Sequence, residues 1–166
     1  MILGMSTSTF TATHVVLSLI GIFSGFIVLF GMMGAKKPDG WTALFLATTA
    51  LTSVTGFFFP SASFGAPHAV GIISLAVLAV AIFALYVGHL AGHWRWIYVV
   101  TAVVALYLNV FVAVVQAFQK LPFLNPLAPT QSEPPFLIAQ LIVMAIFIAL
   151  GILTVRRYHP RIDASA

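Results

Sequence analysis

The chain contains five apolar runs, each close to the length that an α-helix needs to cross a bilayer. They cover residues 13–34, 41–59, 68–90, 96–118 and 135–155. A helix rises ~1.5 Å per residue, so about 20 apolar residues cross the ~30 Å hydrocarbon core. None of the runs shows the alternating pattern of a membrane β-barrel strand. The sequence therefore predicts an all-α, polytopic integral membrane bundle of five transmembrane helices in a single domain, residues 1–166.

Composition supports a membrane protein and excludes several other classes. Only 6% of the residues are charged and the mean hydropathy is +1.13, whereas a soluble domain carries about 25% charged residues. The net charge of +4 does not indicate a nucleic-acid partner, because the few basic residues lie at the ends of apolar runs. The chain has no cysteine, which excludes disulfides, Fe–S clusters and haem attached through cysteine.

The distribution of basic residues predicts the orientation. With five spans, one side of the membrane carries Lys36, Lys37, Arg95, Arg156, Arg157 and Arg161, and the other side carries only Lys120. Cytoplasmic loops are enriched in Lys and Arg. We therefore expect an outside N-terminus and a cytoplasmic tail at residues 156–166, in a bacterial-type inner membrane or a plasma membrane. The first run lacks the basic region of a secretory signal, and both Met1 and Met5 are candidate start residues.

A set of polar residues lies inside the apolar runs at similar depth. Asn109 is about 20 Å along the fourth run from Trp96 by helical rise, just beyond the membrane midplane. The full predicted set is His14, Ser18, Thr52, His68, Asn109, Gln116 and Gln140. One interpretation is an outward-facing, ligand-binding or pore-lining pocket. The other is interhelical bonding at ~0.6 kcal/mol per contact, with Ser and Thr bonding their own helix backbone.

The connection over residues 119–134 is long and rich in proline. Such a segment is predicted to be stiff and extended. It suggests either a lid over the outward pocket, in which Lys120 and Glu133 pair, or a simple spacer between two helices.

Two further patterns have a functional and a structural interpretation. Gly21 and Gly25 form a GxxxG pattern, which predicts close helix packing either in a homodimer or, as we favour, within the bundle. His89 and His93 are four residues apart and would share a helix face, which suits either a chelated metal or, as we favour, an interfacial anchor.

No catalytic constellation is present, since the acids Asp39, Glu133 and Asp163 all lie outside the apolar runs. The sequence favours a non-enzymatic protein that binds a hydrophobic or amphipathic ligand, or an accessory or transport subunit. One alternative is a redox protein with b-type haem or quinone near His14 and His68, which are also the candidate metal ligands. A second alternative is an oligomeric ion or small-solute channel. The expected partners are the lipid bilayer and a homo-oligomer or larger membrane complex.

Overall fold

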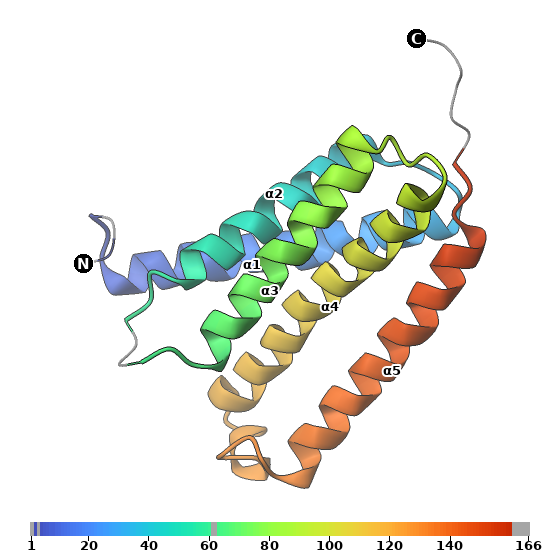
Figure 1. The fold of residues 1–166 in the computed structure, drawn as a ribbon. Coiled ribbons are helices and arrows are strands. Elements are labelled where there is room, and N and C mark those ends of the chain that lie inside the picture. The colour runs from blue at the N-terminus through green and yellow to red at the C-terminus, as the bar shows by residue number, and fades with distance from the viewer. Residues whose placement is uncertain (1, 3, 61–62, 161–166) are drawn as a thin grey trace.

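The computed structural model describes residue 2, residues 4–60 and residues 63–160, which form helices and no strand. The five long helices are α1 (Thr7–Met33), α2 (Asp39–Gly56), α3 (Ala66–Ile82), α4 (His93–Lys120) and α5 (Pro134–Arg157) (Figure 1). A π-helical turn, η1 (Phe83–Val87), extends α3, and a 3₁₀ turn, η2 (Asn125–Leu127), lies between α4 and α5. The prediction of an all-α structure is confirmed, and each helix overlaps one predicted run.

Among the described residues, four helical stretches are long and apolar enough to cross a membrane: α1, Ala66–Val87, α4 and α5. The chain thus has the helices of a membrane protein. The second predicted span is shorter and more polar than the others, because α2 has 18 residues and six of them carry hydroxyl groups.

Half of these six hydroxyl groups are satisfied within α2 itself. The hydroxyls of Thr48, Thr52 and Thr55 donate to the carbonyl oxygens four residues earlier at 2.7, 2.8 and 2.7 Å. A hydroxyl bonded to its own helix backbone loses much of its cost in an apolar environment. The composition of α2 is therefore compatible with its place inside the bundle, between α1 and α3.

The helices pack closely at one end and diverge toward the other (Figure 1). The closely packed half contains the C-terminal half of α1, the N-terminal halves of α2 and α4, and the end of α3. Its buried core includes Val28, Leu29, Phe45, Leu78, Ala81, Leu85, Tyr98, Val99 and Leu106. In contrast, α5 packs mainly on α4 and touches α1, which leaves much of its apolar surface exposed.

Gly25 allows α1 to lie directly against its neighbours in this core. A Cβ atom at Gly25 would be 2.6 Å from Leu106 Cδ1 on α4 and 2.9 Å from Phe45 Cε2 on α2. At Gly21 it would be 3.2 Å from Thr49 Oγ1. These contacts lie within one chain, so they support the interpretation of Gly21 and Gly25 as packing residues of the bundle.

The turn after α1 contains an alanine in the left-handed conformation, Ala35, with φ of 56°. This conformation costs an L-residue about 1–2 kcal/mol, and glycine adopts it freely. We expect Ala35→Gly to stabilise the protein by about 0.5–1 kcal/mol after the greater entropy loss of glycine is included. Thermal unfolding in a non-ionic detergent measures the effect. Ala47→Gly, on the exposed face of α2, should destabilise by about 1 kcal/mol, and equal shifts in the two variants would contradict the prediction.

The connection between α3 and α4 corrects the prediction for the two histidines near it. His89 and Leu90 have positive φ values of 47° and 58°, and His93 begins the next helix. The two imidazoles therefore do not share one helix face, since a tight turn interrupts the helix between them. Within the described residues, no group of three His, Cys, Asp or Glu side chains is placed to hold a metal ion.

Candidate functional site: a cavity between four helices

A cavity of about 710 Å³ lies among α1, α2, α3 and α4 in the half of the bundle where the helices diverge. Seven of the residues predicted for the outward pocket or its lid line it: His14, Ser18, Thr52, His68, Asn109, Gln116 and Lys120. The structure thus brings together residues separated by more than one hundred positions in the sequence.

The walls of the cavity are apolar between these polar groups. They include Val15, Leu19, Phe57, Val70, Leu108, Val112 and Ala113. Lys120, exposed in the last turn of α4, is the lining residue with a full charge, and no Asp or Glu of the described chain lines the cavity. An apolar cavity with a cation and no carboxylate attracts a molecule that carries both apolar surface and negative charge.

Asn109 is a buried polar residue of the cavity wall, as are Ser53 and Ser74. It is 9% exposed, and its amide Nδ2 donates to Thr49 Oγ1 at 3.0 Å. Its amide oxygen accepts no hydrogen bond from any described residue. Gly21 lies beside this pair, where a Cβ atom would be 3.4 Å from Asn109 Nδ2. The Asn109 NH₂ group therefore joins α4 to α2. Its amide oxygen remains available as a hydrogen-bond acceptor in a residue that lines the cavity.

His14 is oriented by a neighbouring threonine. Its Nδ1 lies 2.8 Å from Thr55 Oγ1, while the Thr55 hydroxyl donates to the carbonyl oxygen of Leu51 at 2.7 Å. A hydroxyl that donates to Leu51 leaves its lone pairs for His14, and this arrangement favours the imidazole Nδ1 as the donor to Thr55. The neutral ring is then the Nδ1–H tautomer, whose Nε2 carries the lone pair. The Phe59 ring packs edge-on at 5.0 Å and limits rotation of the imidazole.

His68 has a structural partner at the start of α3. Its Nδ1 accepts a hydrogen bond from the backbone N–H of Gly65 at 3.3 Å, which caps the helix. The rings of Phe57 and Phe64 pack against it at 5.9 and 5.4 Å. Its position in the cavity wall is therefore explained by helix capping and aromatic packing.

Gln140 was predicted to join this cluster, but it lies elsewhere. It is buried on α5 and its Nε2 donates to the carbonyl oxygen of Phe111 on α4 at 3.2 Å. Its Oε1 is buried without a hydrogen-bond partner among the described residues. The prediction was wrong for this residue because α5 packs on the outside of α4, away from α2 and α3.

The predicted pairing of Lys120 with Glu133 is also absent among the described side chains. The carboxylate of Glu133 accepts hydrogen bonds from Thr130 N, Thr130 Oγ1 and Ser132 N at 3.2, 2.7 and 3.1 Å. These bonds, led by the Thr130 hydroxyl, lower the pKa of Glu133 below its usual value. Glu133 therefore organises its own turn.

The long loop is folded against α4 and does not cover the cavity. Asn125 Nδ2 donates to the carbonyl oxygen of Phe118 at 3.3 Å, and Gln131 Nε2 donates to that of Val115 at 3.0 Å. Of the predicted lid, only Lys120 and Leu121 line the cavity. The extended lid was an incorrect expectation, because amide side chains of the loop bond to carbonyl groups near the end of α4 and draw the loop onto that helix.

Sequence reasoning omitted two partners from the site, Thr49 and Thr55. Thr49 holds Asn109, and Thr55 orients His14. The sequence feature that could have indicated them is the series of Thr and Ser residues along α2. This series does not show which of the hydroxyl groups face another helix.

Comparison with known proteins assigns no relative to this chain. No protein-family model, curated protein or solved structure matches it.

Proposed function

We propose that this protein is a five-span membrane protein that binds an amphipathic organic anion in the cavity between α1, α2, α3 and α4. The observation that carries the proposal is the composition of the cavity wall. Its volume of about 710 Å³ is bounded mostly by apolar side chains, with Lys120 as its charged group and no carboxylate among the described lining residues. The apolar body of a ligand would contact the walls, and its anionic head would pair with Lys120.

The spacing along α4 defines the expected size of the ligand. Lys120 and Asn109 are separated by eleven residues, or ~16 Å of helical rise, and Gln116 lies between them. This length suits a simple alkyl chain with a carboxylate at the Lys120 end. The amide oxygen of Asn109 and the Nε2 of His14 would supply acceptors for a ligand that also carries a hydroxyl group.

We also propose that α2 crosses the membrane as the fifth span and that the N-terminus lies outside. A helix of 18 residues covers ~27 Å, near the thickness of the hydrocarbon core. The contact of Thr55 with His14 joins the last turn of α2 to the second turn of α1, so α2 returns along nearly the whole length of that helix. Lys36, Lys37, Arg95, Arg156 and Arg157 lie at the opposite end from Lys120, which favours an outside N-terminus. Arg161 lies outside the described residues.

Binding of dodecanoate to the purified protein tests this function. In a non-ionic detergent, dodecanoate should displace a fluorescent fatty acid from the wild-type protein. Lys120→Gln should weaken dodecanoate binding about tenfold, the effect of losing about 1.4 kcal/mol of charge pairing. Dodecanol, which lacks the charge, should bind the wild type and this variant equally.

Two control variants distinguish binding in the cavity from general attraction to positive charge and from partitioning of the probes into detergent micelles. Lys36→Gln removes an exposed cation at the other end and should leave binding unchanged. Ser18→Phe should fill the cavity and abolish binding of both probes while the variant retains its helical circular dichroism. Equal loss of dodecanoate binding in Lys120→Gln and Lys36→Gln, or full binding in Ser18→Phe, would refute the assignment.

A redox role is the second candidate, because His14 and His68 line the same cavity. A b-type haem would give the purified protein a Soret band that disappears in His14→Ala, and a quinone would be recovered by lipid extraction. A colourless preparation free of extractable quinone, after supplementation with both, would eliminate this candidate.

Transport is less well supported by the packing of one chain. The closely packed half of the bundle, on the other side of Asn109 from the cavity, is filled by buried side chains such as Phe45, Leu106 and Val99. A channel would therefore need a path between copies of the chain or beside a partner subunit.

A further inference from the structure

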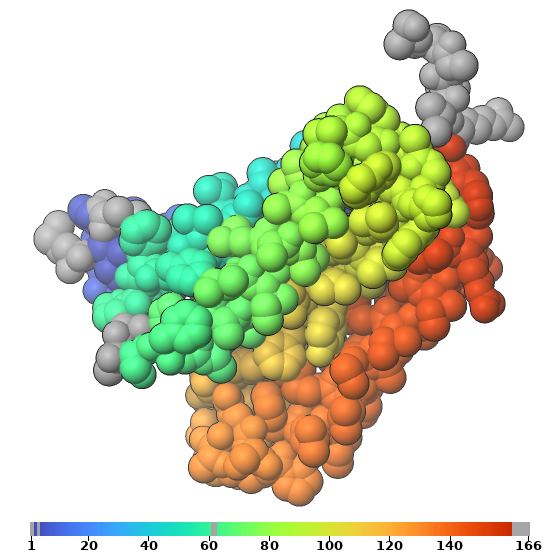
Figure 2. Space-filling model, viewed as in Figure 1, coloured from blue at the N-terminus to red at the C-terminus, as the bar shows by residue number. Residues whose placement is uncertain are grey.

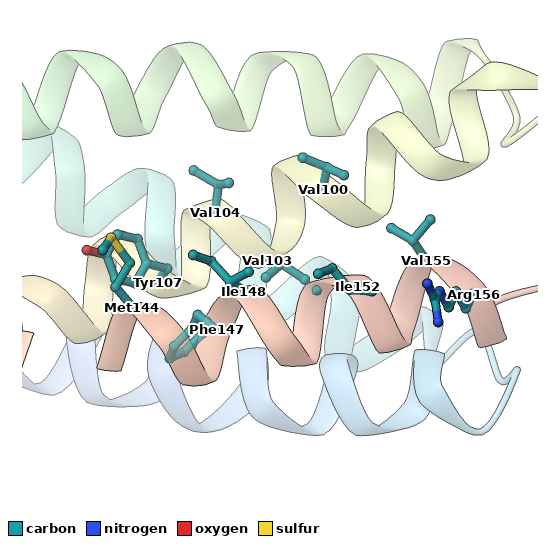
Figure 3. A pocket seen from close by; sticks show the side chains of 11 residues that line it. Val100, Val103, Val104, Tyr107, Met144, Phe147, Ile148, Ile152, Val155 and Arg156 are labelled. Carbon is teal, nitrogen blue, oxygen red and sulfur yellow. The ribbon is translucent and has the colours of Figure 1, made fainter. Parts of the chain in front are cut away.

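A second hollow lies between α4 and α5, apart from the cavity described above. It has a volume of about 490 Å³ and is lined by Val100, Val103, Val104 and Tyr107 of α4 and by residues of α5 from Met144 to Arg156. Figure 2 shows a furrow where α5 lies against α4, and Figure 3 shows the side chains that form it. We call this hollow the α4–α5 groove.

The groove lies beside Phe147, which packs on Tyr107 of α4 with ring centroids 5.7 Å apart, and between two polar attachments of α5 to α4. Toward one end, Gln140 Nε2 donates to the carbonyl oxygen of Phe111 at 3.2 Å. At the other end, Arg95 donates to the carbonyl oxygens of Tyr158 and Val155 at 2.6 and 3.2 Å. Between these attachments, small and β-branched side chains such as Gly151 and Val104 leave a space that the two helices do not fill.

The groove has the dimensions and polarity of a site for one acyl chain. From Met144 to Arg156 the helix rises ~18 Å, slightly more than half of the ~30 Å hydrocarbon core. The lining is aliphatic or aromatic except for Arg156, which lies at one end of the row of side chains (Figure 3). A groove that is apolar over one leaflet and cationic at its end matches a lipid with an anionic head group.

The charge at the cationic end is reinforced by its neighbours. Arg156 and Arg157 are exposed in the last turn of α5, and Arg95 lies beside them on α4. Of these three, Arg95 is engaged with backbone carbonyls, while the guanidinium group of Arg156 stands at the groove. Basic pockets between transmembrane helices bind the head groups of anionic lipids.

We propose that an anionic phospholipid of the surrounding bilayer binds in the α4–α5 groove, with one acyl chain along Val104 and Gly151 and its phosphate against Arg156. The site is separate from the cavity that contains Lys120, and it does not depend on the function proposed for that cavity.

Native mass spectrometry of the protein released from nanodiscs tests this site. The nanodiscs contain equal amounts of phosphatidylglycerol and phosphatidylcholine with identical acyl chains. The wild type should retain phosphatidylglycerol in preference to phosphatidylcholine, and Arg156→Gln should reduce that preference about fivefold. Arg157→Gln removes the same charge from the adjacent position, which does not line the groove, and should retain most of the preference.

Variants that fill the groove test the acyl-chain contact. Gly151→Leu should reduce retention of both lipids, because its side chain would occupy the space beside Val103, where a Cβ atom is tolerated at 3.5 Å. Val104→Phe should have the same effect and serves if Gly151→Leu does not fold. Lys120→Gln should leave lipid retention unchanged.

Three results would overturn the proposal. Equal losses in Arg156→Gln and Arg157→Gln would indicate general attraction of anionic lipid to a basic surface. Undiminished lipid retention in both Gly151→Leu and Val104→Phe would exclude the groove. A two-chain complex that is lost in these two variants would instead identify a second copy of the chain as the occupant.

Discussion

Gly25→Val should produce one of the largest losses of stability available from a single substitution in this chain. Even a methyl group at this position would lie 2.6 Å from Leu106 Cδ1 and 2.9 Å from Phe45 Cε2. Both side chains are 1% exposed, so neither can move into solvent or lipid. The added side chain must push α1 away from α2 and α4.

The expected cost is about 3 kcal/mol, at the upper end of the range for overpacked cores. Thermal unfolding in detergent should show a large decrease in transition temperature, and the separation of α1 should open the neighbouring contact between Asn109 and Thr49. Gly40→Ala is the matched control, because no atom lies within 4 Å of a Cβ at that glycine. A Gly25→Val protein as stable as Gly40→Ala would show that α1 does not pack at this depth.

Arg95→Gln should detach the C-terminal end of α5 from the bundle. Arg95 donates through one guanidinium nitrogen to the carbonyl oxygens of Tyr158 and Val155 at 2.6 and 3.2 Å. These carbonyls belong to the end of α5, where backbone acceptors have no partner within the helix and the helix dipole is negative. The guanidinium group therefore satisfies acceptors and compensates charge at the same time.

The expected loss is about 1.5 kcal/mol, the lower end of the range for a hydrogen bond with a charged donor, because Arg95 is partly exposed. Hydrogen exchange over residues 150–158 should become faster, with little change in the core of α1 to α4. Arg157→Gln removes an equal charge at the same end and should leave this exchange unchanged, since no hydrogen bond joins the Arg157 side chain to a described residue. Equal exchange in Arg95→Gln and the wild type would show that α5 is held by other contacts.

Tyr158 also anchors this end of α5 to the bundle through its side chain. Its side chain is 1% exposed and its ring lies 6.4 Å from that of Tyr98. Burial raises the pKa of Tyr158 to about 12. The structure places this ring inside the bundle.

The fold class follows from local properties that can be read along the chain. Five runs of apolar residues, separated by proline, glycine and charged residues, predict five helices. Their boundaries differ from the observed ones by at most six residues when η1 is counted with α3. Helix formation in an apolar environment depends on length and hydrophobicity, because each backbone group must bond within its own segment. Each run has the required length and hydrophobicity in its own sequence, without a contribution from the other runs.

Part of the polar lining of the cavity was predictable, since seven of the nine predicted pocket and lid residues line it. Depth along a helix is set by residue number, so polar residues of similar depth could be grouped before their neighbours were known. Gln140 and Glu133 were misplaced because depth does not say which side of a helix faces which neighbour. That choice depends on α5 packing outside α4 and on the loop bonding to the end of α4.

Apolar helices and the positions of polar groups along them can be read from the residues of each segment. The contact of Asn109 with Thr49, the orientation of His14 by Thr55 and the groove beside α4 depend on how the helices pack. The reason is physical: helix formation and membrane depth depend on contacts and hydrophobicity within one segment. Helix adjacency and rotation depend on the mutual fit of side chains, such as Gly25 against Leu106, from segments far apart in the chain.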